Sequence, residues 1–119
     1  MKRRAWLVAL LAAGGTAAHA NPSAGERVRI EGLLAAVGRR DDIRFLRNGK
    51  EYSCVQAAEF LRGKFLWQIE KIATAQDFIE RVGTRSTLSG DVYRVRLGDG
   101  RVVTSAEFLR QELRRLDKR

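Results

Sequence analysis

Residues 43–56 read IRFLRNGKEYSCVQ and decide the fold, because they predict a hairpin that runs directly into a helix. Residues 43–47 and 50–53 are predicted to form two short strands joined by a two-residue turn. Asn48-Gly49 lies between them and is typical of a type I′ turn, which needs positive φ at both central positions. The sequence therefore predicts a tight antiparallel hairpin at this point.

The hairpin is followed by a helix start signal. Ser53 and Gln56 match a capping box, which predicts a long helix from Cys54 to about Ile72. Phe60 and Trp67 stand one heptad apart beside its apolar side, and we expect both to belong to the core. The residues of the apolar side itself recur at helical spacing: Ala58, Leu61, Phe65, Ile69 and Ile72.

Two further helices flank this unit. Apolar residues at helical spacing predict a first helix over residues 24–37 that ends at Gly38. Thr74 and Asp77 restart the chain as a third helix that ends near Gly83, although one bent helix through this region is the alternative. The apolar positions of these two helices are Ile30, Leu33, Leu34 and Val37 in the first and Phe78, Ile79 and Val82 in the third.

A second hairpin and a last helix complete the chain. Residues 84–91 are rich in hydroxyls and turn formers, which predicts a loop. Residues 92–97 alternate as a strand, turn at 98–100 and pair with a short strand over 101–103. Thr104 or Ser105 caps the last helix, whose apolar residues are Phe108, Leu109, Leu113 and Leu116.

These elements give the order helix, hairpin, two helices, hairpin, helix, which predicts a single small α+β domain. The pentapeptide AEFLR occurs at 58–62 and again at 106–110, each time after a hairpin with a glycine-containing turn. This repeat indicates either a duplicated hairpin–helix unit or a coincidence among common helix formers; the order of elements favours duplication.

Residues 1–20 have the pattern of a cleavable export signal. A basic start is followed by an apolar core and by the small residues Ala18 and Ala20, which suit cleavage after Ala20. The apolar core is too short for a membrane-spanning anchor. We therefore expect a periplasmic domain over residues 21–119, exported by the general route, with the pair Arg3-Arg4 leaving twin-arginine export as the alternative.

Cleavage changes the composition. It removes three basic residues and leaves 20 Lys and Arg against 14 Asp and Glu, a net charge of +6. This balance favours an acidic envelope component or another envelope protein as partner, whereas an ordinary basic surface is the alternative. Export argues against nucleic acid as the partner. A basic face carrying Arg94 and Arg96 is one candidate contact surface, and a hydrophobic groove between helices is another.

The chemistry open to the mature domain is narrow. Cleavage removes His19, the only histidine, and with it the commonest general base and metal ligand. Cys54 is the only cysteine and is predicted at the first position of a helix, where a thiol pKa can fall. Without a histidine, Glu51 and Glu59 are poor bases, so we expect Cys54 to be a small buried core residue.

Two other candidate sites have weak signals. Ser86 and Ser89, with Arg85 as a charge partner, have the residue types of an anion-binding loop, although such residues are also the ordinary ones of a turn. Asp41-Asp42 is an isolated acidic pair without the spacing of a calcium loop. We therefore expect neither a metal nor another cofactor.

The chain resembles the YfeK-like family of small exported bacterial proteins, whose function is unknown. The resemblance implies an exported domain and assigns no catalytic residue; Gly83-Thr84-Arg85 departs from it, where a more helix-compatible run is expected. The motifs that carry it are Phe45-Leu46-Arg47-Asn48-Gly49, Tyr52-Ser53, Ala57-Ala58, Leu61-Arg62-Gly63-Lys64, Thr74-Ala75-Gln76-Asp77-Phe78-Ile79, Ser86-Thr87-Leu88-Ser89-Gly90 and Tyr93.

The sequence thus predicts a non-enzymatic binding or interaction module of the cell envelope. The alternative is a small envelope enzyme whose nucleophile is Cys54 or a hydroxyl of Ser86 or Ser89.

Overall fold

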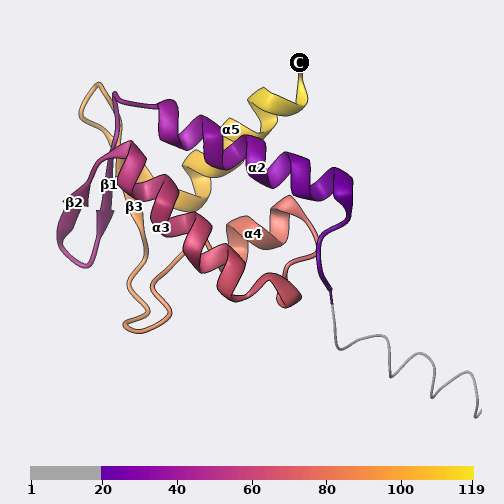
Figure 1. Cartoon of the computed structure of the whole chain (residues 1–119). Coiled ribbons are helices and arrows are strands. Elements are labelled where there is room, and N and C mark those ends of the chain that lie inside the picture. Colours follow the sequence, from indigo (N-terminus) through magenta and orange to yellow (C-terminus); the bar gives the residue numbers. More distant parts are fainter. Residues whose placement is uncertain (1–19) are drawn as a thin grey trace, which may run out of the picture.

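The computed structural model describes residues 20–119, so the predicted signal, with Ala18 but without Ala20, lies outside the described residues. Ala20 is exposed, and its N–H donates to the Glu70 carbonyl at 2.8 Å. The predicted order of elements is confirmed (Figure 1). Helices and strands run α2 (Ala24–Arg39), β1 (Arg44–Arg47), β2 (Lys50–Tyr52), α3 (Cys54–Trp67), a 3₁₀ turn η1 (Ile69–Lys71), α4 (Ala75–Arg81), β3 (Arg94–Arg96), β4 (Val102–Thr104) and α5 (Ser105–Asp117).

The two hairpins join into one four-stranded antiparallel sheet with the order β2-β1-β3-β4. Its centre is the pairing of β1 with β3, in which Phe45 stands opposite Val95. Asn48 and Gly49 both have positive φ, at 49° and 79°, as the predicted type I′ turn requires. The helices gather on one side of the sheet (Figure 1), which confirms the α+β class and leaves the other face uncovered.

Each hairpin leads through a capping residue straight into a helix, so the hairpin–helix unit occurs twice. Ser53 caps α3 and Thr104 caps α5, and the next residues, Cys54 and Ser105, are both buried. The AEFLR repeat is not the structurally equivalent part. Phe60 lies seven residues after its cap, whereas Phe108 lies only four after its own. The architecture is therefore repeated, and the pentapeptides are shifted within it by three residues.

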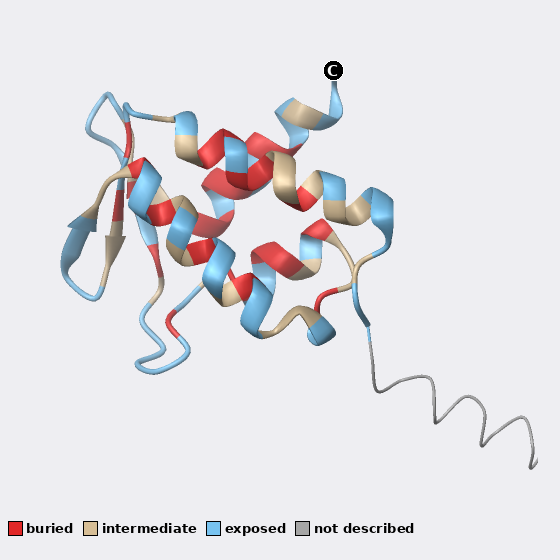
Figure 2. Ribbon diagram, in the orientation of Figure 1, coloured by how far each residue is buried: buried red, intermediate tan, exposed pale blue. Residues whose placement is uncertain are grey.

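The core lies between the sheet and the helices, with α2 packed against α3, α4 and α5. Figure 2 shows the buried side of each helix turned toward the others. The predicted apolar residues of α2, α4 and α5 are confirmed as buried, with Leu116 half-buried at the end. Every residue of the core cluster lies between Ile30 and Leu113, so a chain that begins at Asn21 contains the whole of the described core.

The first helix does not end at Gly38, as predicted, but at Arg39. Gly38 has ordinary helical geometry and faces α3, where an added Cβ would make an ordinary van der Waals contact, 3.5 Å from Cβ of Ala58. Its carbonyl also accepts a hydrogen bond from the Cys54 thiol at 3.2 Å. Gly38 is therefore a residue of α2 that contacts α3, and it is not a helix cap.

The predicted long helix to Ile72 is wrong in its last turn. α3 ends at Trp67, the 3₁₀ turn follows, and Ile72 has extended backbone with a fully buried side chain. Thr74 then caps α4 as predicted, and the carboxylate of Asp77 accepts from the Ala73 N–H. The chain has to turn here, because α4 packs back against α2 and α5.

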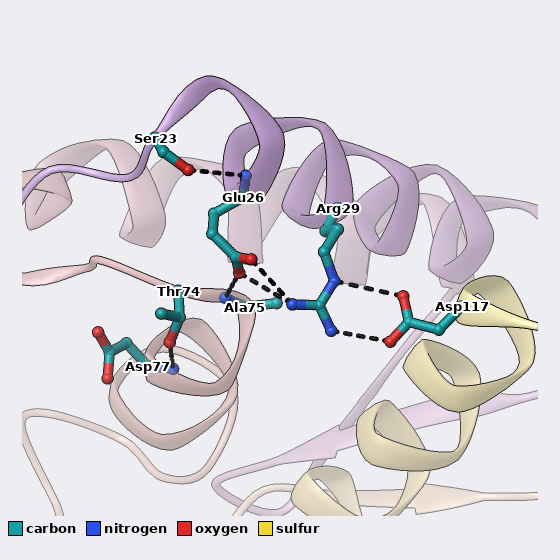
Figure 3. Close-up of polar contacts among 7 residues, drawn as sticks. All are labelled: Ser23, Glu26, Arg29, Thr74, Ala75, Asp77 and Asp117. Atoms are coloured by element: carbon teal, nitrogen blue, oxygen red, sulfur yellow. Dashed lines mark hydrogen bonds and ion pairs between the residues drawn. The ribbon is translucent and has the colours of Figure 1, made fainter.

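The carboxylate of Glu26 joins the starts of two helices (Figure 3). Its Oε1 accepts from the Ala75 N–H at 2.8 Å and from Arg29 at 3.0 Å. Arg29 also binds Asp117 at the end of α5 with two N–H groups, at 2.8 and 3.3 Å. The hydrogen bond from Ala75 and the neighbouring Arg29 hold the pKa of Glu26 below its usual range.

We predict that Glu26→Ala lowers the free energy of unfolding by about 1–2 kcal/mol at pH 7, because an N–H at the start of α4 loses its acceptor. Since the folded pKa is depressed, the ionised carboxylate stabilises the protein above its unfolded pKa and loses this effect as the pH falls through the folded pKa. Urea unfolding should therefore show a smaller difference from wild type at pH 3. Glu80→Ala, on the exposed side of α4, is the control.

Gly83 follows α4 at a point of close approach. A Cβ added there would lie 2.4 Å from Cδ1 of the buried Leu109 and 3.3 Å from the Ile79 carbonyl oxygen. We predict that Gly83→Ala lowers the free energy of unfolding by about 1–3 kcal/mol through overpacking. Gly63→Ala is the matched control: this exposed glycine lies within α3 with open space around it and should gain about 0.5–1 kcal/mol. Equal effects of the two substitutions in thermal unfolding would contradict the packing argument.

Candidate functional site

A surface groove lies between α3, the end of β1 and the loop that follows α4. It has a volume of about 390 Å³ and adjoins a second depression of about 420 Å³, with Arg47 and Phe60 lining both. No acidic residue lines the first groove. Its lining residues are Arg47, Asn48, Phe60, Lys64, Trp67, Ser86, Thr87, Leu88 and Tyr93.

Arg47 forms the ridge between the two depressions. Its guanidinium carbon lies 4.1 Å from the centre of the Phe60 ring and 5.2 Å from that of Tyr52, and its Nε is buried without a hydrogen-bond partner. Five arginines are half-buried in residues 20–119, and four of these have a carboxylate partner. Arg47 is the exception: its guanidinium lies over two aromatic rings and forms no ion pair with a carboxylate of residues 20–119, although Glu59 lines the adjoining depression with it.

Lys64 is the second cation of the groove and the half-buried lysine of the described chain. Its Nζ donates to the Arg85 carbonyl at 2.7 Å and contacts the Tyr93 hydroxyl at 3.1 Å, both neutral groups. Burial lowers the pKa of Lys64, and the charge of Arg47 lowers it further. Burial also raises the pKa of Tyr93, which keeps the phenol neutral beside the ammonium group. The groove thus holds two neighbouring cations with no counter-charge.

Two apolar side chains stand on the rim of this groove. Trp67 is 82% exposed at the end of α3, and Leu88 is fully exposed on the facing loop. The expectation that Trp67 belongs to the core is therefore wrong, because α3 ends there and turns its indole outward. Phe60 does pack against the core, edge-on to Tyr93 with ring centres 5.7 Å apart.

The hydroxyls of the predicted anion-binding loop hold its turn. Oγ of the buried Ser86 accepts from the Ser89 N–H at 3.2 Å, and the Ser86 carbonyl accepts from the Gly90 N–H at 2.9 Å. The Ser89 hydroxyl contacts the Asn48 side chain at 2.9 Å. Arg85 is exposed, and its carbonyl oxygen accepts the hydrogen bond from the Lys64 ammonium group. Ser86 lines the groove, but the loop chiefly presents Leu88.

Arg94 and Arg96 lie elsewhere, on the uncovered face of the sheet, opposite to the face of Tyr93 and Val95 as predicted. Arg96 stands across from Arg44 and forms an ion pair with Glu51 at 2.7 Å. Arg94 is exposed, with an N–H 3.4 Å from the Val92 carbonyl. The predicted contact residues therefore divide between two surfaces, and on the sheet face one charge already has a carboxylate partner.

Cys54 is buried, with 6% of its surface exposed, as predicted for a core residue. Its thiol donates to the Gly38 carbonyl. Asp41 and Asp42 are exposed, and Asp42 is bound by Arg40 at 2.8 Å. Residues 20–119 contain no group of three or more potential metal ligands. None of their helices is both long and apolar enough to cross a membrane.

Sequence reasoning did not identify Arg47, Lys64 and Tyr93 as site residues. They come from β1, from α3 and from the residue just before β3, and only the folded chain brings them together. One local signal was present: Phe60, Lys64 and Trp67 recur at spacings of four and three, which places them on one face of a helix.

The fold and the groove describe a small α+β domain with a cationic, aromatic surface site. Residues 24–117 match the model of a family of unknown function, DUF5329, and the chain belongs to this family, as its resemblance to YfeK-like proteins predicted. The uncharacterised protein YfeK of Salmonella typhimurium is 37% identical over 76 residues, 64% of this chain and 63% of that protein. The match thus spans less than two thirds of the relative's length. No solved structure matches the chain.

We predict that the Cys54 thiol reacts with DTNB roughly a hundredfold more slowly in the native protein than in denaturant, because reaction requires local or global opening. The rate should rise in the destabilised variant Gly83→Ala. If the native protein is labelled rapidly and stoichiometrically, at a rate that does not depend on its stability, Cys54 is not buried. The alternative of an enzyme that uses this thiol would then be favoured.

Proposed function

We propose that the mature domain is a non-enzymatic binding module of the cell envelope that captures an anionic group in the groove of Arg47 and Lys64. The observation that carries the proposal is the pair of half-buried cations without a carboxylate partner. Such a pair is unfavourable by itself, since each charge is partly desolvated and repels the other. An anion between them would remove both penalties and would gain charge-assisted hydrogen bonds.

The envelope location rests on the export signal read in residues 1–20. A binding role is favoured over catalysis because the mature chain contains no histidine and its single thiol is buried. The hydroxyls of Ser86 and Ser89 take part in turn contacts, which makes them poor nucleophiles.

The groove is the better candidate than the sheet face. Arg96 already pairs with Glu51. The sheet face is open to solvent, which screens the attraction between its exposed charges and an anion. In the groove, low exposure strengthens the attraction for an anion.

The test is an amide NMR titration of the protein from Asn21 onward with pyrophosphate and with a tetraglutamate peptide, at fixed ionic strength. We predict saturable shifts around Arg47, Lys64 and Leu88. Lys64→Gln and Arg47→Gln should each weaken binding roughly three- to tenfold, the loss of one charge-assisted contact. Lys118→Gln and Arg94→Gln remove the same charges at exposed positions outside the groove and should have little effect.

The controls decide between the surfaces. If Arg94→Gln weakens binding and Arg47→Gln does not, the anion binds to the sheet face and the groove proposal is wrong. If all four variants weaken binding equally, the domain responds only to net charge. Thermal unfolding of each variant separates lost binding from lost folding, which matters most for Arg47 because it packs on two rings.

A further inference from the structure

We infer that the anion bound in the groove is the phosphate of an anionic phospholipid, and that Trp67 and Leu88 enter the headgroup region of the membrane on either side of it. This inference rests on the proposed anion-binding function and names its ligand. The exposed apolar side chains on the rim of the groove support it as much as the two cations do.

The two apolar side chains protrude from the groove rather than line its floor. Leu88 has its whole side chain in solvent, and Trp67 keeps 82% of its surface exposed. Both belong to the same groove as Lys64. A receptor for an apolar ligand would hold such side chains recessed, whereas fully exposed ones are placed to enter an apolar medium.

The loop that carries Leu88 is held in a fixed shape. Three hydrogen bonds close the turn: from the Ser89 and Gly90 N–H groups to Ser86, and from the Ser86 N–H to the Asp91 carbonyl. The contact between Ser89 and Asn48 ties the turn to the first hairpin. Leu88 is therefore presented by a preorganised turn, which reduces the entropy lost when it inserts.

The chemistry of the rim and the groove suits a membrane interface. Tryptophan is favoured at headgroup level because its ring is apolar and its N–H is polar. Leucine at the tip can reach the upper acyl region, and cations just behind it attract anionic headgroups. Arg47 and Lys64 line the same groove as the two apolar side chains, and no carboxylate that could repel a phosphate lines this groove.

The test uses Trp67 as its own reporter, since the other tryptophan, Trp6, lies before the predicted cleavage site. The protein from Asn21 onward is mixed with vesicles of phosphatidylcholine, with and without phosphatidylglycerol. With phosphatidylglycerol present we expect a blue shift of Trp67 emission and quenching by lipids brominated on the upper acyl chain. Pure phosphatidylcholine should give neither effect at the same concentration.

Variants connect the signal to the groove. Leu88→Gln should weaken vesicle binding about tenfold through lost apolar insertion, and Lys64→Gln should weaken it about threefold. Val28→Gln is the matched control, because Val28 is a 70% exposed apolar residue on α2, outside the groove. If Val28→Gln weakens binding as much as Leu88→Gln, the association is a non-specific one and the inference is overturned.

The outcome separates this inference from the proposed function. If phosphatidylglycerol vesicles leave Trp67 emission unchanged while pyrophosphate or the tetraglutamate peptide still binds in the groove, the ligand is a soluble anion or an acidic protein segment. The lipid inference is then wrong and the proposed function stands. If neither vesicles nor soluble anions bind, both are wrong.

Discussion

The pairing of β1 with β3 is the interaction on which the rest of the structure depends. Each hairpin alone is two strands of three or four residues, too small to be stable in water. Pairing Phe45 with Val95 joins segments fifty residues apart and buries both side chains. Because each hairpin runs directly into its capping residue, the same pairing brings α3 and α5 to one face of the sheet. It also decides which arginines face the helices: Arg47 turns toward α3, whereas Arg94 and Arg96 face outward.

Local signals in the sequence predicted the elements well. The Asn48-Gly49 turn and the caps at Ser53 and Thr74 depend on residues next to them in the chain, and all three occur as expected. The predictions were wrong where a distant contact decides the conformation. α2 continues through Gly38 to Arg39 and packs there against α3, and α3 stops at Trp67 because α4 must return to α2. The strand order was not predictable, since nothing in either hairpin specifies its neighbour.

The candidate site likewise combines a part that local sequence signals predicted with a part that depends on distant contacts. The loop of Ser86 and Ser89 was predictable because its residue types are typical of turns, yet the hydroxyls expected to bind an anion form contacts within the protein. Arg47 and Lys64 gave no signal of their own in a chain this rich in basic residues. What distinguishes them is partial burial without an ion pair to a carboxylate, and this environment forms only when β1, α3 and the residue before β3 meet.

The absence of a partner at Arg47 is informative because the chain supplies partners elsewhere. Arg29 binds Asp117 across the fold and Arg40 binds the buried Glu112, so the other half-buried guanidinium groups of residues 20–119 are neutralised. Chains whose local choices agree with the fold usually depart from them at functional sites. In residues 20–119 three departures coincide at one groove: an arginine without a carboxylate, a lysine beside it, and an outward-facing pair of apolar side chains. Each departure lowers the stability of the folded protein. A ligand that is anionic in its head and apolar in its body offsets all three at once, and a phospholipid has that chemistry.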